Sequence, residues 1–253
     1  MGTFVTNLHA RDADRNAVIE ALRSLGVVPA YVRDSPESTW TSIFPEAADQ
    51  DQAALFGLAR GLSKALKRPV IAFIVHDSDI FLYWLYDKGN ELDRYNSAPG
   101  FFTGEEVPPE GGNPDKLAAF CPPGTPIERL MQVLHPEKKT VDVETAVKEA
   151  VRKKLRQSYP AIAAKMPNPP SLEEFLANAE KRMAARKPSS GVSPRFATDG
   201  FLLAKDRAVG LAKLLGIPDG PAIDSYRYLV EGEGSPGSLT LVHAEGERSV
   251  SVD

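Results

Sequence analysis

Residues 70–95, which read VIAFIVHDSDIFLYWLYDKGNELDRY, decide the expected fold. Val70 to Val75 form a continuous apolar run of strand length, which is typical of a strand buried on both faces. Ile80 to Tyr86 and Glu91 to Tyr95 follow as two more strands, and the turn residues Lys88-Gly89-Asn90 lie between them. The stretch therefore predicts a sheet that is extended by a hairpin.

The residues before this stretch alternate between strand and helix patterns. Extended runs are expected at 3–9, 27–33 and 39–44, and helical spacing is found at 15–25 and again after the candidate cap Asp51, where leucines recur from Leu55 to Leu66. Pro69 ends the second helix, because proline cannot continue it. With the strand at 70–75 the element order is βαββαβ, which is the ferredoxin-like arrangement. We therefore expect an α+β fold with a ferredoxin-like sheet domain over residues 1–97.

The rest of the chain divides by composition. We expect a Pro/Gly-rich connector at 98–126 and a helical segment at 127–187. A linker at 188–198 and a small helix-plus-hairpin α/β unit at 199–253 follow. In the helical segment, Ser171 and Glu174 have the spacing of a capping box. In the last unit, a helix that ends at Gly216 precedes expected strands at 226–230 and 238–243.

Composition excludes several classes of protein. The first residues lack the features of a signal peptide, and no apolar run approaches the roughly 20 residues that cross a bilayer, so we expect a cytoplasmic protein without a membrane segment. A formal net charge of −4 argues against a surface that binds nucleic acid as a whole. The single cysteine, Cys121, excludes an intramolecular disulfide and a multi-cysteine zinc site.

One candidate site is a cluster of His76, Asp77 and Asp79 at the end of the 70–75 strand. Imidazole and carboxylate groups are ligands for divalent metals such as Mg²⁺ or Mn²⁺. The Asp-x-Asp spacing is similar to the metal-binding motif of nucleotide-sugar glycosyltransferases, although the parallel nucleotide-binding half of those enzymes is missing here. The competing interpretation is a polar hairpin turn, because Asp and Ser are favoured turn residues.

The second candidate site is aromatic. Strand alternation places Trp84 and Tyr86 on one face of the 80–86 strand and Tyr83 on the other, so both faces are apolar. With Tyr95 and Asn96 these residues are the candidate binding residues. RNA-recognition domains share the strand order and stack bases on such rings, but their signature run is absent.

Two functional hypotheses follow. The preferred one is a non-catalytic binding or regulatory protein, for example a bacterial accessory protein, that docks a protein partner or a second copy of itself and needs no cofactor. The alternative is a metal-dependent enzyme that acts on a phosphate or sugar-phosphate, with Asp77 and Asp79 as ligands and His76 as ligand or catalytic base.

Overall fold

The computed structural model describes residues 3–105, 107–136 and 203–252, and parts of the segment between them, namely 152–153, 155–156, 158–160, 162–164, 166 and 169–185. The chain divides into two compact units. The first comprises residues 1–136 and 203–253, and the second comprises residues 137–202.

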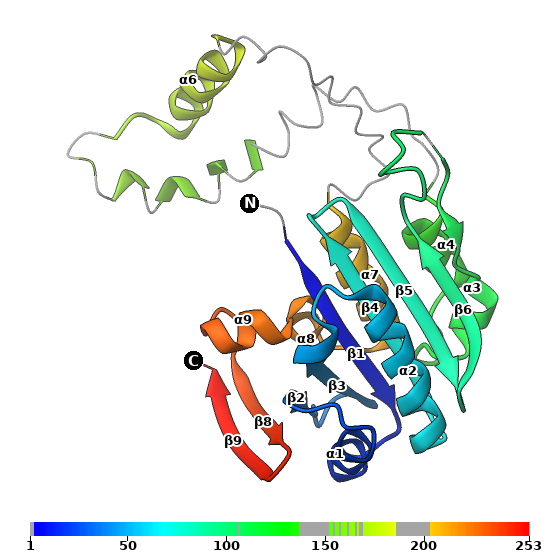
Figure 1. Cartoon of the computed structure of the whole chain (residues 1–253). Helices are drawn as coiled ribbons and strands as arrows, with labels where there is room; N and C mark the ends of the chain where they lie inside the picture. Colours follow the sequence, from blue (N-terminus) through cyan, green and yellow to red (C-terminus); the bar gives the residue numbers. More distant parts are fainter. Residues whose placement is uncertain are drawn as a thin grey trace. The chain divides into compact units, whose positions relative to one another are not determined.

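The first unit is built on one large antiparallel sheet. Its nine strands among the described residues are β1 (Val5–Arg11), β2 (Ala30–Arg33), β3 (Trp40–Pro45), β4 (Pro69–His76), β5 (Ile80–Asp87), β6 (Asn90–Asn96), β7 (Glu110–Gly111), β8 (Gly237–His243) and β9 (Gly246–Val252). They lie in the order β7-β6-β5-β4-β1-β3-β2-β8-β9 (Figure 1). The mixed α+β fold with an antiparallel sheet is therefore confirmed.

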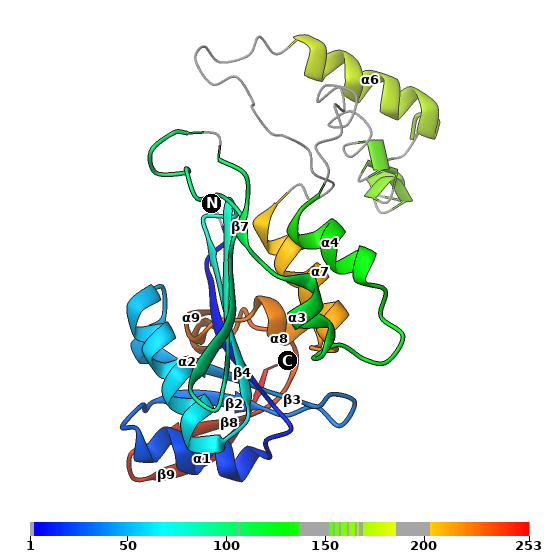
Figure 2. The same cartoon turned by 90° about the vertical axis from the view of Figure 1, so that its right-hand side faces the viewer.

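Helices cover both faces of this sheet. They are α1 (Arg15–Ser24), the 3-10 turn η1 (Glu46–Ala48), α2 (Gln52–Leu66), α3 (Pro114–Ala118), α4 (Ile127–Leu134), α7 (Ala204–Leu215), α8 (Asp219–Ile223) and α9 (Tyr226–Glu231). Figure 2, which views the sheet nearly along its plane, shows α1 and α2 on one side and α3, α4, α7 and α8 on the other. Each side of the sheet thus has its own buried layer.

Local signals explain where α1 and α2 begin and end. The carboxylates of Asp14 and Asp51 accept hydrogen bonds from the amides of Ala17 and Ala54, both at 2.9 Å, and so cap the two helices. Helix α2 ends at Lys67, whose φ of 53° leaves the helical region. The apolar faces of α1 and α2 pack on alternate residues of the strands, and the largest cluster of buried side chains includes Leu8, Leu22, Ile43, Leu55, Leu62, Val70 and Ala72.

The opposite face is also buried, and this chain's own helices cover it. Helix α7 contacts β4, β5 and α4, and α8 contacts β1. Phe73, Phe81, Tyr83 and Leu85 are fully buried. The apolar character of both faces of the 80–86 strand therefore has its explanation within the chain.

In the second unit, the described residues include α6 (Leu172–Ala185). The expected capping box is confirmed, because the Glu174 carboxylate accepts hydrogen bonds from the amide and hydroxyl of Ser171, both at 2.9 Å. Glu173 lies within 4 Å of both Arg152 and Arg156. The expected helix that begins near Val143 and the linker at 188–198 lie largely or wholly outside the described residues.

The C-terminal segment differs from expectation in one element. Residues 226–230 were expected as a strand, and this is wrong, because they form α9 between Ser225 and Gly232, whose φ of 75° ends the helix. A short apolar run fits either a strand or a buried helix, and periodicity does not separate the two. The hairpin is formed instead by β8 and β9, and β8 pairs with β2 of the main sheet. Among the described residues, no helix is long and apolar enough to cross a membrane.

Candidate functional site

The predicted metal cluster lies in the tight turn between β4 and β5. Asp77 and Ser78 have φ values of 50° and 64°. The Asp79 amide donates to the His76 carbonyl at 3.0 Å, and the Ser78 hydroxyl accepts a hydrogen bond from the Thr3 amide at 2.7 Å. The backbone of the turn is therefore held by hydrogen bonds within this end of the sheet.

The side chains of this turn offer little to a cation. Asp77 and Asp79 are exposed, and His76 is half-buried with its ring against Phe4 and its Nδ1 3.3 Å from the Gln50 amide oxygen. Burial and the charge of Asp77 raise the pKa of Asp79. In the part of the chain that the structure describes, no three His, Cys, Asp or Glu side chains gather in a group that could hold a metal ion.

Three of the predicted aromatic residues are buried. The Tyr83 hydroxyl donates to the Asp93 carboxylate at 2.6 Å, and the Tyr95 hydroxyl donates to the Leu134 carbonyl at 2.7 Å. Burial raises the pKa of both phenols, that of Tyr95 to about 12. Tyr86 lies in the layer beneath α2 with 6% of its surface exposed. These rings stabilise the fold from inside it.

Trp84 and Asn96 line an open groove of about 400 Å³ on the α2 side of the sheet. The register of β5 and β6 places Trp84 opposite Arg94 and Leu82 opposite Asn96, so these four side chains share one face. We call this space the Trp84 groove. It is lined, among others, by Gln52, Ile80, Leu82, Trp84, Arg94, Asn96, Pro99, Phe102 and Glu110.

The rim of the Trp84 groove exposes aromatic surface. Phe102 is 80% exposed and Phe101 is 43% exposed, and their rings meet edge to face at a centroid distance of 5.2 Å. On its other side Trp84 is supported by Phe56, whose ring centroid lies 3.4 Å from that of Trp84. Exposed rings beside an apolar groove are the kind of surface that proteins use for binding.

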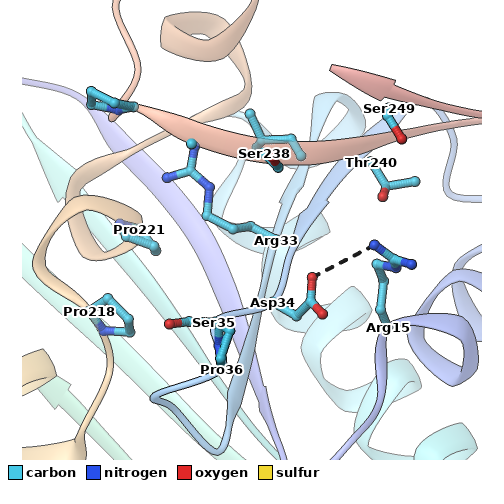
Figure 3. Close-up of a pocket in the computed structure, with 13 residues that line it drawn as sticks. Arg15, Arg33, Asp34, Ser35, Pro36, Pro218, Pro221, Ser238, Thr240 and Ser249 are labelled. Carbon is cyan, nitrogen blue, oxygen red and sulfur yellow. Dashed lines mark ion pairs between the residues drawn. The ribbon is translucent and has the colours of Figure 1, made fainter. Parts of the chain in front are cut away.

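A second open space, of about 390 Å³, lies where β2 ends (Figure 3). We call it the Arg33 pocket. Arg15 of α1, Asp34 after β2, and Thr240 and Ser249 of the C-terminal hairpin lie at one end. Arg33 lies at the other end with Pro218, which precedes α8, and Pro221 within α8. Thr240 and Ser249 are direct partners in the β8–β9 register, so both hydroxyl-bearing side chains lie on the same face.

Arg33 is held by a buried polar network. One terminal nitrogen of its guanidinium lies 3.1 Å from the Asp224 carboxylate, and the other donates to the Ser235 carbonyl at 2.8 Å. Only 8% of the Arg33 side chain and 4% of the Asp224 side chain are exposed. Burial raises the pKa of Asp224, and Ser235 and Arg33 oppose this shift. The Nε atom of Arg33 is buried and has no hydrogen-bond partner among the described residues.

Behind this network, Ser42, His9 and Asn7 form a hydrogen-bonded chain. The Asn7 Nδ2 group donates to carbonyls of Pro221 and Asp224 at 3.0 Å, which leaves its Oδ1 to accept a hydrogen bond from His9 Nε2 at 2.9 Å. His9 Nδ1 is then the acceptor for the Ser42 hydroxyl at 2.8 Å. Burial lowers the pKa of His9 to about 3, so the ring is neutral.

The order Ser-His-Asn has the connectivity of a hydrolytic triad, but its position excludes that chemistry. His9 and Asn7 are fully buried and Ser42 is 2% exposed, so no substrate reaches the hydroxyl. A nucleophile must lie beside a space where the reacting atom can sit. The hydrogen bonds among Ser42, His9 and Asn7 therefore serve to satisfy buried polar groups between β1, β3 and the segment around α8.

Sequence reasoning did not find Arg33, Asp224 or the His9 chain. One local signal was available, because Asn7 and His9 alternate with apolar residues inside a strand that is otherwise suited to burial. No local signal joins Arg33 to Asp224, which lie 191 residues apart. Comparison with known proteins adds no assignment, since no protein-family model, curated protein or solved structure matches the chain.

Proposed function

We propose that this protein is a non-catalytic binding protein, and that the Trp84 groove is its protein-docking site. The observation that carries the proposal is the exposure of Phe101 and Phe102 directly beside a groove with an apolar floor. Aromatic residues are enriched at the centres of protein interfaces, where they contribute much of the binding energy.

The occupant that this surface fits best is a second copy of the chain. A two-fold axis brings the same patch of two subunits together, so the patch must be self-complementary. Here a protruding ring, Phe102, stands beside the hollow over Ile80 and Leu82. Two copies related by a two-fold axis can each place Phe102 in the groove of the other.

The charges on the rim support the same arrangement. Arg94 and Glu110 both line the groove and both are exposed. In a two-fold complex, Arg94 can face the partner subunit's Glu110, and the reverse contact forms by symmetry. A patch that carries one charge of each sign is therefore complementary to itself, which favours a second copy over a strongly charged partner.

The proposal includes two finer expectations from the sequence. The first is the ferredoxin-like domain over residues 1–97, which the βαββαβ element order from β1 to β4 and the neighbour order β4-β1-β3-β2 support. The cytoplasmic location stays a prediction.

The test is the mass of the native chain in solution, measured by light scattering after size exclusion and by sedimentation across a concentration series. We expect a dimer, and we expect Phe102→Ser to weaken it by about 2 kcal/mol or more, roughly thirtyfold in Kd. Val230→Ser is the matched control, because Val230 is 58% exposed on α9 and lies outside the groove.

Charge reversal sharpens the test. Arg94→Glu and Glu110→Arg should each weaken the dimer, since each places like charges together at two symmetric positions, and the double variant should recover. A native chain that is monomeric at its highest soluble concentration overturns the self-docking proposal. A dimer that is indifferent to Phe102→Ser also overturns it, because its interface then lies elsewhere.

A further inference from the structure

We propose that the Arg33 pocket binds the phosphoryl group of a small molecule. This inference is independent of the docking surface, because the pocket is formed by β2, α1 and the β8–β9 hairpin and shares no lining residue with the Trp84 groove. Its volume of about 390 Å³ falls in the range of small-molecule sites, which is roughly 300–1,000 Å³.

The charges that line the pocket favour an anion. Arg15 and Arg33 both line the pocket, but Arg33 is already paired with the buried carboxylate of Asp224, so Arg15 is the cation that an entering anion meets. Arg15 and Asp34 are 3.9 Å apart with about half of each side chain exposed, so their ion pair is weak and an anion can take the place of Asp34. Figure 3 shows Arg15 and Asp34 directed into the same space as Thr240.

Hydroxyl groups supply the further donors that a tetrahedral anion needs. Ser35, Ser238, Thr240 and Ser249 all line the pocket, and each carries one O–H donor. A planar carboxylate is satisfied by one arginine in a two-pronged contact, whereas a phosphoryl group has three oxygens that accept from several directions. A surplus of separate donors therefore favours phosphate over carboxylate.

Arg33 forms a rigid part of the pocket wall. Asp224 and Ser235 fix its guanidinium, and only 7% of the surface of Arg33 is exposed. Its Nε still lacks an acceptor among the described residues. Because the Nε atom is itself buried, the guanidinium serves as a fixed part of the pocket wall, and the donors within reach of an entering anion are Arg15 and the hydroxyl groups.

The opposite wall suits the organic part of such a molecule. Pro36, Pro218, Pro221 and Pro236 line it, and Leu239 adds a further apolar side chain. Proline rings lose little conformational freedom when a ligand packs on them. The pocket thus pairs a polar, cationic end with a rigid apolar wall.

The test is binding of inorganic phosphate, pyrophosphate and glycerol phosphate to the full chain, measured by calorimetry at constant ionic strength with chloride as the reference anion. Arg15→Gln should reduce affinity about tenfold, as expected for loss of one charge-assisted hydrogen bond. Arg23→Gln is the matched control, since Arg23 is exposed on the same helix and does not line the pocket. It should change affinity less than about twofold if only a screened surface charge is lost.

NMR spectra locate the site without relying on a variant. Phosphate should shift the amide resonances of Ser238, Thr240 and Ser249, and acetate at the same concentration should not. The proposal fails if none of the three phosphate probes binds, if acetate binds as well as phosphate, or if Arg23→Gln weakens binding as much as Arg15→Gln. The last result would mean that phosphate responds only to the overall charge of the chain.

Discussion

Lowering the pH should destabilise this protein through one buried side chain, His9. The ring is fully buried between Asn7 and Ser42, and burial lowers its pKa from 6.5 to about 3. A depressed pKa means that the folded state binds its proton at a lower pH than the unfolded state does. The stabilising contribution is therefore complete above pH 6.5 and is lost as the pH falls from 6.5 toward 3.

The size of the effect follows from these two values. Between about pH 7.5 and pH 5 the unfolded histidine takes up nearly one proton and the folded one takes up almost none. Each pH unit below 6.5 then costs about 1.4 kcal/mol, so 1.5 units reduce the free energy of unfolding by about 2 kcal/mol. That is a large part of the stability of an ordinary domain.

The assay is urea unfolding of the native chain and of His9→Gln at both pH values. Carboxylates titrate in both proteins, so their effect cancels in the difference, and the native chain should lose about 2 kcal/mol more than the variant. If the variant does not fold, an NMR titration of the native chain replaces it, and the His9 ring should stay neutral at about pH 5. Equal losses in the two proteins, or a His9 midpoint near 6.5, would refute the reasoning.

Two further perturbations address the buried layers, both measured by urea unfolding. Arg33→Met should lower the free energy of unfolding by about 3–5 kcal/mol, because it leaves Asp224 charged and buried. The double variant Arg33→Met with Asp224→Leu should lose less stability than the single variant. Equal losses would contradict the pairing of Arg33 with Asp224. Phe73→Ala should cost about 3–5 kcal/mol at a fully buried site, and Leu25→Ala, at a residue 41% exposed, should change stability by less than about 0.5 kcal/mol.

The central strands and their connections could be predicted because their signals are local. Lys88 and Gly89 turn the chain between β5 and β6 with φ values of 51° and 81°, as the turn residues indicated. The apolar run at 70–75 is a central strand with partners on both sides, β1 and β5. Such features depend on neighbours within a few residues, and composition and periodicity report them directly.

The candidate sites depend on contacts between distant segments and could be predicted only in part. Trp84 and Asn96 were expected as binding residues and line a groove, but the burial of Tyr83 depends on which face of the sheet each helix covers, and no local pattern states that. The Arg33 pocket requires the pairing of β2 with β8. Pairing partners are set by the packed fold, and no local pattern in either strand specifies the other.

The pairing of β2 with β8 also bears on how the chain is made. Tyr31 lies opposite Leu241, so β2 is synthesised about 210 residues before the strand that pairs with it. A ribosome adds about 5–20 residues each second, and during that interval β2 is an edge strand with unpaired backbone groups. Nascent chains that stop before β8 thus present an open edge, which makes truncated products prone to pair with one another.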